Sequence, residues 1–276
     1  MKNIYITDLD HTFLRTDLSL SDFSKEIWNG MSSDSVMSIA TARTYKKSMQ
    51  FLKDIEINAP MILLDGALIA TRERKIIDTK FINKEVADII IEEGAKFGIY
   101  PFILSLADRN LSETFSYSTI LNKHQIEVLK NYKNDDHHNL QSNLRAMEDN
   151  FKIVYFGDEV LLREVASHIE RIFGDRLKYI LAPEAYVGCY FLTVLHKDAD
   201  KSHGIKSVSE HAGFDLEKLS VFGDNFNDIG MFELAGTSVA VANAQEGVKK
   251  AADIVLPHTN DEDGVAKYLQ SLKSAK

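Results

Sequence analysis

Short apolar runs alternate along the chain with longer segments in which apolar residues recur every three or four positions. The first pattern is typical of buried strands and the second of amphipathic helices. The predicted helices include one capped by Ser21 and the segments 45–55, 201–212 and 246–251. The predicted strands between them lie at residues 4–6, 35–40, 60–64, 219–222, 239–241 and 254–256. Such strand–helix repetition predicts a parallel sheet with right-handed crossovers.

The middle of the chain has strand and helix patterns of its own. A helix is predicted from Asn83 to about residue 97, and another over 160–173. The polar stretch 106–145 is expected to contain helix and exposed loop. Further strands are predicted at residues 99–104, 151–156, 177–181 and 190–195. These elements form an α/β unit that is bracketed by the two halves of the first pattern.

We therefore expect an α/β fold with a doubly wound, Rossmann-like parallel sheet. Its two chain segments are predicted to be residues 1–81 and 189–276, with residues 82–188 as the inserted unit. No internal repeat, low-complexity segment or Gly/Ser linker interrupts the chain. A chain of 276 residues is long enough for two such units, each with a core.

Composition narrows the classes of partner. Net charge is -9, from 41 acidic and 32 basic residues, which disfavours a nucleic-acid partner. No apolar run approaches the length of a membrane span, and the N-terminus lacks the pattern of a signal peptide. Cys189 is the only cysteine, which excludes an internal disulfide and a thiolate zinc cluster. We expect a cytoplasmic protein with neither a nucleic-acid nor a membrane partner.

Acidic residues gather directly after two of the predicted strands. Asp8 and Asp10 follow the first strand, and Asp224 and Asp228 follow a strand near the other end of the chain. In doubly wound sheets, ligands bind outside the carboxyl ends of the strands. Together these carboxylates would give the oxygen-only site that suits Mg²⁺. Taken singly, each group also fits a polar turn or a helix cap.

Two further positions can serve an anion. Thr41, followed by Ala42 and Arg43, ends the second predicted strand. A hydroxyl and backbone N–H groups at such a turn can hold a phosphate oxygen, although a capping threonine beside a solvated arginine fits equally. Lys201 begins a helix, where a lysine is ordinarily solvent-facing. No Gly-x-Gly-x-x-Gly or Walker-type loop supports dinucleotide or P-loop chemistry.

The order of these groups resembles that of the haloacid-dehalogenase-like phosphatase superfamily. Residues 8–12 read Asp-x-Asp-x-Thr, and residues 223–228 read Gly-Asp-x-x-Asn-Asp, with Thr41 and Lys201 between them. Within that superfamily the chain is similar to the Cof-type branch, which carries a large α/β cap. The resemblance covers essentially the whole chain, with residues 82–188 as the cap. It implies a phosphoric monoester hydrolase, a phosphatase that acts on a small phosphorylated metabolite such as a sugar phosphate.

The resemblance also implies a role for each residue. Asp8 is the expected nucleophile, which forms an aspartyl-phosphate, and Asp10 is the expected general acid and base. Mg²⁺ is expected on Asp8, the Asp10 backbone carbonyl and Asp224, with Asp228 orienting that shell from behind. Thr12 is expected to bond the turn after Asp10. The expected phosphate contacts are the backbone at Leu9 and Ala42 and the side chains of Thr41, Lys201 and Asn227.

Two positions depart from the family pattern. His11 stands where the family usually has Gly, so its backbone is expected to adopt an unusual conformation that His tolerates. Asp65-Gly66 replaces the usual Asn-Gly and adds a carboxylate near the anion site. Elsewhere, His137 and His138 are expected in an exposed loop, and Cys189 as a buried small residue.

Two alternatives stay open beside the phosphatase. A sugar phosphomutase would use the same intermediate but return the phosphoryl group to the sugar, so release of free phosphate separates the two. A phospho-ligand sensor would retain the fold without catalysis. The joint presence of a nucleophile, Asp8, and an acid/base, Asp10, argues against the sensor, because binding alone needs neither.

Overall fold

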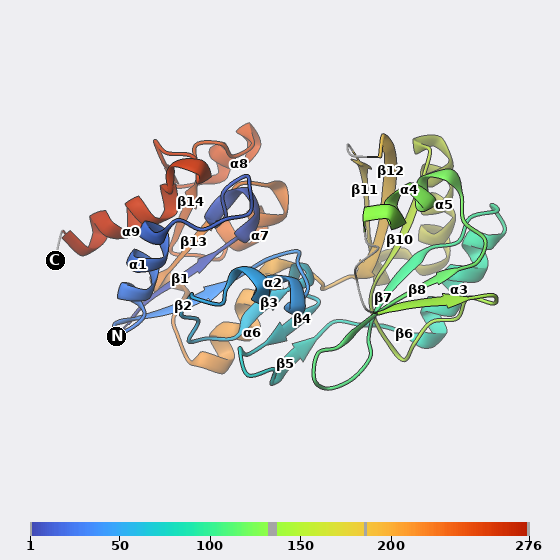
Figure 1. Ribbon diagram of the computed structural model, residues 1–276, viewed down its shortest axis with the longest axis horizontal. Coiled ribbons are helices and arrows are strands. Elements are labelled where there is room, and N and C mark those ends of the chain that lie inside the picture. Colours follow the sequence, from blue (N-terminus) through green and yellow to red (C-terminus); the bar gives the residue numbers. More distant parts are fainter. Residues whose placement is uncertain (1, 132–136, 185–186, 275–276) are drawn as a thin grey trace. The chain divides into compact units, whose positions relative to one another are not determined.

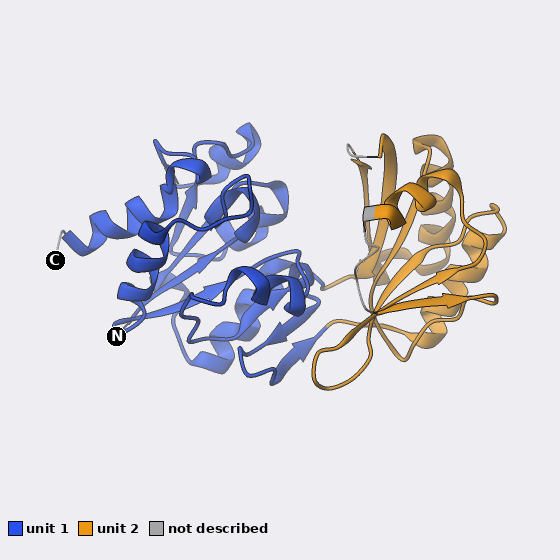
Figure 2. Cartoon of the chain, viewed as in Figure 1, with its two compact units in different colours: residues 1–79, 199–276 blue, residues 80–198 orange. Residues whose placement is uncertain are grey.

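The computed structural model describes residues 2–131, 137–184 and 187–274. The chain divides into two compact units, coloured separately in Figure 2: unit 1 is residues 1–79 with 199–276, and unit 2 is residues 80–198. The second segment of unit 1 thus begins at Ala199, later than the expected 189. The reason is strand β12 (Cys189–His196), which pairs with β10 and β11 inside unit 2.

The core of unit 1 is a five-stranded parallel sheet (Figure 1), which confirms the predicted fold class. Alternating strands and helices fold this way because each parallel pair needs a crossover. Side chains such as Ile6, Val221 and Val239 are fully buried in it. In spatial order the strands are β15 (Ile254–Val255), β14 (Thr237–Ala240), β13 (Leu219–Gly223), β1 (Asn3–Thr7) and β2 (Ser35–Ile39).

Helices flank this sheet. Ser21 caps the first of them as predicted, since its hydroxyl accepts a hydrogen bond of 2.9 Å from the Ser24 N–H. That helix, α1, packs against α9, while α6 packs against the β3–β4–β5 sheet. The helices of unit 1 are α1 (Asp22–Met31), α2 (Tyr45–Phe51), α6 (Lys201–Ala212), α7 (Ile229–Phe232), α8 (Glu246–Ala251) and α9 (Gly264–Ser274).

The predicted third core strand, residues 60–64, has a different place. It forms β3 (Met61–Leu63), which pairs antiparallel with β4 (Leu68–Ala70), and β4 pairs with β5 (Ile76–Thr79). One parallel bridge, between Ala40 and Ile62, joins β3 to the end of β2. The chain reverses at Leu64 and Asp65, whose φ values of 51° and 54° make a tight turn. This reversal commits β3 to a hairpin.

Unit 2 is built on a mixed sheet covered on one face by two helices (Figure 1). Strands β11 (Leu177–Glu184), β12, β10 (Asp149–Gly157), β7 (Phe102–Leu106), β8 (Glu113–Ser118) and β9 (His138–Gln141) follow one another in space. Helices α3 (Lys84–Ala95) and α5 (Glu159–Phe173) bury Ile90, Ile169 and Leu192 in a common core. Asn83 caps α3 as predicted. Short strand β6 (Ile82–Asn83) pairs with β10, and α4 (Lys123–Asn131) follows β8.

The polar stretch 106–145 is more regular than expected. Besides the helix α4 it contains strands β8 and β9, so His138 begins a strand and only His137 is exposed in a turn. In β8, Phe115 and Tyr117 alternate with Ser116 and Ser118, so the two kinds of side chain lie on opposite faces of the sheet. The two serines are buried, and both rings contact Phe102 on β7. Cys189 is buried, as predicted. Over the described ranges, no helix combines the length and the apolarity needed to cross a membrane.

Candidate active site

Three strand ends bring the candidate residues to one edge of the core sheet. Asp8 follows β1, Thr41 follows β2 and Asp224 follows β13, and these strands are parallel neighbours. The backbone N–H of Asp8 donates to the Phe222 carbonyl over 2.9 Å, which extends the β1–β13 pairing to the site itself. The edge is the one at which ligands bind in open α/β sheets.

A buried lysine joins two carboxylates. The Nζ of Lys201 lies 2.6 Å from Oδ1 of Asp8 and 2.6 Å from Oδ1 of Asp228. Lys201 is only 1% exposed, so the solvent-facing alternative for this residue is wrong. Burial alone would lower the pKa of Lys201, but Asp8, Asp228 and, more weakly, Asp65 raise it above its usual range. The lysine therefore stays a cation.

Three carboxylates crowd beside that lysine. Asp8, Asp224 and Asp228 each offer an oxygen atom, and these atoms lie within 4.8 Å of one another. Burial raises the pKa of Asp8 well above its ordinary value, with Lys201 opposing and Asp228 adding to the rise. Burial and the neighbouring Asp228 raise the pKa of Asp224 to about 6. The single positive charge of Lys201 does not balance the negative charge that three carboxylates can carry. Their oxygen atoms are the ligands that a hard divalent cation such as Mg²⁺ prefers.

Asp228 is fixed on both of its oxygens. Oδ1 accepts from Lys201, while Oδ2 accepts from the backbone N–H groups of Asp224 and Asn225 over 2.9 and 3.0 Å. Gly223 makes this close approach possible, because a Cβ there would meet Asp228 Oδ2 at 2.5 Å. Because both oxygens of Asp228 already accept hydrogen bonds, this residue is suited to orient Asp224 and Lys201.

Thr12 belongs to the same cluster. Its hydroxyl donates to Oδ1 of Asp224 over 3.0 Å, across 212 positions of sequence. The expectation that Thr12 bonds the turn after Asp10 is therefore replaced by a contact with the second acidic motif. His11 has the expected unusual backbone, with a φ of 56°, and this left-handed residue turns the chain from Asp10 to Thr12.

Asp10 has a partner that the sequence reading missed. Both of its carboxylate oxygens bind the Arg43 guanidinium, with Nη2 to Oδ1 at 2.5 Å and Nε to Oδ2 at 2.8 Å. The alternative of a solvated arginine beside a capping threonine does not hold for Arg43, whose side chain is only 21% exposed. The Thr-x-Arg spacing after the second strand is the signal that could have found it, because it places the arginine at the same sheet edge as Asp10.

The remaining predicted phosphate contacts lie at turns. Thr41 is buried, and its hydroxyl accepts from the Arg43 N–H over 3.2 Å, while Thr44 and not Thr41 caps α2. Leu9 opens the irregular segment Leu9–Phe13 with its side chain fully buried, and Ala42 is exposed. Their roles in phosphate binding stay predictions.

Asn227 is tied to the second departure from the family pattern. Its Nδ2 donates to Oδ1 of Asp65 over 2.9 Å. The N–H of Asp65 donates to the Thr41 carbonyl over 3.0 Å, so the Asp65 turn is also tied to the end of β2. The added carboxylate of Asp65 is thus paired with the Asn227 amide.

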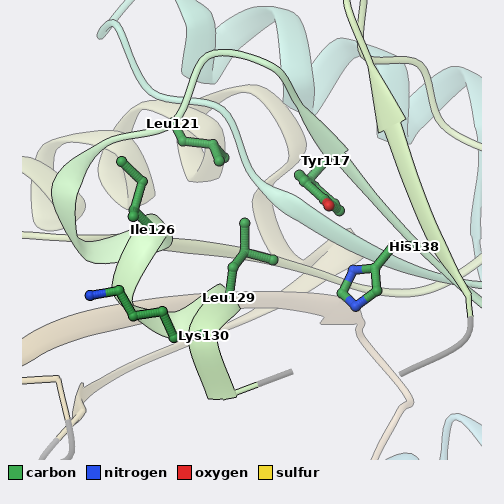
Figure 3. Close-up of a pocket in the computed structure, with 6 residues that line it drawn as sticks. All are labelled: Tyr117, Leu121, Ile126, Leu129, Lys130 and His138. Carbon is green, nitrogen blue, oxygen red and sulfur yellow. The ribbon is translucent and has the colours of Figure 1, made fainter. Parts of the chain in front are cut away.

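A separate pocket lies within unit 2 (Figure 3). It measures about 550 Å³ and is lined by Ile126, Leu129 and Lys130 on α4 together with Tyr117, Leu121 and His138. In the close-up, Leu129 points toward Tyr117 and His138, whereas Lys130 extends away from them. These six lining residues include no carboxylate. The pocket therefore offers no site for a hard cation, and the acidic cluster of unit 1 is the better candidate for chemistry.

The chain is similar in sequence to known phosphatases and in fold to a solved structure. The chain is 22% identical over 267 residues to 5-amino-6-(5-phospho-D-ribitylamino)uracil phosphatase YitU of Bacillus subtilis, covering 95% of this chain and 94% of that protein. It is 24% identical over 298 residues to the phosphatase YwtE of the same organism, which carries the same substrate name, covering 100% and 99%. The crystal structure of TM0651 from Thermotoga maritima superposes with a TM-score of 0.82 at 26% identity, covering 98% of this chain and 97% of that one.

The family model for haloacid dehalogenase-like hydrolases matches residues 5–269. That range includes both acidic motifs, the buried lysine and the whole of unit 2. The resemblance inferred from the motifs is thereby confirmed, and the chain belongs to the haloacid dehalogenase-like hydrolase family.

Proposed function

We propose that this protein is a Mg²⁺-dependent phosphatase that hydrolyses the phosphate monoester of a small metabolite through an aspartyl-phosphate on Asp8. The observation that carries the proposal is the buried contact of Asp8 with Lys201, set beside Asp224 and Asp228. A carboxylate that attacks a phosphate dianion must be relieved of like-charge repulsion, and a fixed ammonium beside it does so. The relatives named above are phosphatases by name, which supports the same reaction class.

Each residue then has a defined task. The Asp8 carboxylate attacks phosphorus and displaces the alkoxide, which Asp10 protonates; Asp10 later takes a proton from the water that hydrolyses the acyl-phosphate. Lys201 neutralises charge on the transferred group, with further contacts proposed for Thr41, Asn227 and the N–H groups of Leu9 and Ala42. Bound to Asp8, Asp224 and the Asp10 carbonyl, Mg²⁺ would supply electrostatic stabilisation of that group.

Unit 2 is proposed to act as the cap that selects the organic part of the substrate. Its sheet carries a hollow of about 190 Å³. Aromatic faces such as those of Phe102, Phe156 and Phe191 line it together with polar groups of Lys152, Glu184 and Thr193. Rings with a few hydrogen-bonding groups suit a sugar or polyol phosphate. The name of the substrate of YitU and YwtE, which contains a phosphorylated ribityl chain, agrees with that class.

The test is phosphate release from a panel of sugar, polyol and nucleotide monophosphates, with Mg²⁺ or with EDTA. Wild-type protein should release phosphate only with Mg²⁺, and Asp8→Asn should release none. Phosphate that has moved to another hydroxyl of the same sugar, without free phosphate, would instead identify a phosphomutase. Well-folded wild-type protein that binds these esters and turns none of them over would contradict the proposal.

A further inference from the structure

The pairing of Asp10 with Arg43 carries an inference about this reaction. Asp10 lies in a segment without regular structure, with φ and ψ of -69° and 129°, and the next residue, His11, is left-handed. Its side chain is 34% exposed. A carboxylate in that position has little packing to hold its direction, whereas a general acid must point at the leaving oxygen.

Arg43 fixes the orientation of the Asp10 carboxylate, which the backbone around Asp10 does not. A guanidinium that bonds a carboxylate with two parallel N–H groups fixes both its position and its plane. The bonds are Nη2 to Oδ1 at 2.5 Å and Nε to Oδ2 at 2.8 Å. The plane of the Asp10 carboxylate is thereby set from outside its own segment.

Arg43 is itself held from several sides. Its guanidinium carbon lies 4.6 Å from the centre of the Phe51 ring, on α2. Its backbone N–H donates to Oγ1 of Thr41 over 3.2 Å, and its carbonyl accepts from the Leu64 N–H over 3.1 Å. A side chain anchored in this way at the end of β2 is a rigid support for Asp10.

We infer that Arg43 is a positioning residue for Asp10, which keeps the carboxylate directed for protonation of the leaving group. The inference rests on the proposed function, because only a reaction with a poor leaving group needs the acid. Arg43 forms no bond with the reacting atoms in this role. Its loss should act through Asp10 alone, and it should slow leaving-group release only for substrates whose leaving group needs a proton.

The experiment compares two esters in Arg43→Met and Arg43→Lys. A sugar phosphate from the panel has an alkoxide leaving group that needs protonation, whereas p-nitrophenyl phosphate leaves as a stable anion. For Arg43→Met we expect the single-turnover rate of leaving-group release to fall ~10- to 100-fold with the sugar phosphate and less than ~3-fold with p-nitrophenyl phosphate. Arg43→Lys keeps the charge but not the two-point fork, so it should lie between wild type and Arg43→Met.

A double-mutant cycle tests whether Arg43 acts only through Asp10. Asp10→Asn should show the same dependence on the leaving group, and adding Arg43→Met to it should change the single-turnover rate of leaving-group release no further. Arg15→Met is the matched control, since Arg15 makes a similar two-point pair with Asp263 in the same unit. It should leave the ratio of the two esters unchanged.

Two results would overturn the inference in distinguishable ways. Equal losses with both esters in Arg43→Met, or additive losses in the double mutant, would show that Arg43 binds phosphate or only supports the fold. Wild-type protein without turnover of either ester would overturn the proposed function and this inference with it.

Discussion

Lys201 and Asp8 are 193 positions apart in sequence, yet Nζ and Oδ1 lie 2.6 Å apart and the lysine is almost wholly buried. A buried charge is tolerated only when it is paired and hydrogen-bonded. The pair therefore ties the two chain segments of unit 1 to each other at the sheet edge where chemistry is proposed. We therefore expect stability and the proposed activity to depend on the same contact.

Replacing that lysine should damage both properties. Lys201→Met leaves Asp8 and Asp228 buried without their cation, and we expect a loss of about 3–5 kcal/mol in the free energy of unfolding without metal. Urea denaturation followed by circular dichroism measures it, and phosphate release should be lost. Lys249→Met removes an exposed pair with Glu246 and should change stability by less than ~1 kcal/mol. Equal stability of Lys201→Met and wild type would contradict the buried pairing.

Metal affinity should depend on pH through Asp224. Because the pKa of Asp224 is raised to about 6 without metal, protons compete with the cation below that pH. Titration calorimetry with Mg²⁺ should show affinity that is nearly constant above pH 7. It should fall by up to ~10-fold per pH unit below 6 for each carboxyl that titrates.

The variant Asp224→Asn distinguishes protonation of this ligand from unfolding of the protein at low pH. The variant should bind Mg²⁺ weakly at every pH, with a flatter pH dependence than wild type. Affinity in wild type that does not change between pH 5 and 8 would show that Asp224 is not a ligand.

A methyl group at Gly223 should displace Asp228. In Gly223→Ala the new Cβ meets Asp228 at 2.5 Å or slightly more, so the bonds from Asp228 to the Asp224 and Asn225 N–H groups must lengthen. We expect destabilisation of ~1–3 kcal/mol and a weaker metal site. Gly30→Ala, on α1, meets only the flexible end of Lys273 at 3.4 Å and should stabilise by up to ~1 kcal/mol. Thermal unfolding and Mg²⁺ titration of both variants distinguish the two effects.

Acid should weaken the fold through Asp263. Burial would raise the pKa of this carboxyl, but hydrogen bonds from Arg15, Ser21 and Ser24 outweigh it and leave the pKa below its ordinary value. A group with a lowered folded-state pKa stabilises the protein above its unfolded-state pKa, near ~3.9, and loses that contribution as pH falls through the folded-state value. Asp263→Asn should therefore be less stable than wild type at pH 7.

The stability difference for Asp263→Asn should shrink as the pH falls below 4. Denaturation at a series of pH values measures it, and Asp34→Asn, at an exposed position, provides the control. A difference that persists unchanged to pH 2 would show that the Arg15 pair does not govern this dependence.

Much of the fold was predictable because its signals are local. Alternating strands and helices identify the parallel sheet, and Ser21 and Asn83 mark two helix starts through their own side-chain bonds. The predicted third strand forms a hairpin with β4 and keeps only one parallel bridge to the end of β2. The chain reverses through left-handed backbone at Leu64 and Asp65, which neither residue type predicts. Unit 1 resumes at Ala199 and not at the expected residue 189, because β12 pairs with strands of unit 2 that are distant in sequence.

The residues of the candidate site likewise differ in how far the sequence predicts them. The two acidic motifs could be found because each is a compact run after a strand. The partners of their side chains could not, since Thr12 meets Asp224 and Arg43 meets Asp10 only after the sheet has formed. The burial of Lys201 is likewise a property of packing, and a lysine near a helix start has no sequence signal for it.

The chain leaves unit 1 after Thr79 and returns to it at Ala199, and side chains next to these two points bind each other. The imidazole of His203 and the hydroxyl of Ser207, both on α6, lie 2.6 and 2.8 Å from Oδ2 of Asp78, on β5. The two points at which the chain leaves and re-enters unit 1 are thus held together by contacts within unit 1. A different insert could therefore replace unit 2 between these anchored ends without disturbing the strands that carry Asp8 and Asp224. With the roles proposed above, substrate choice could then diverge while the chemistry stayed the same.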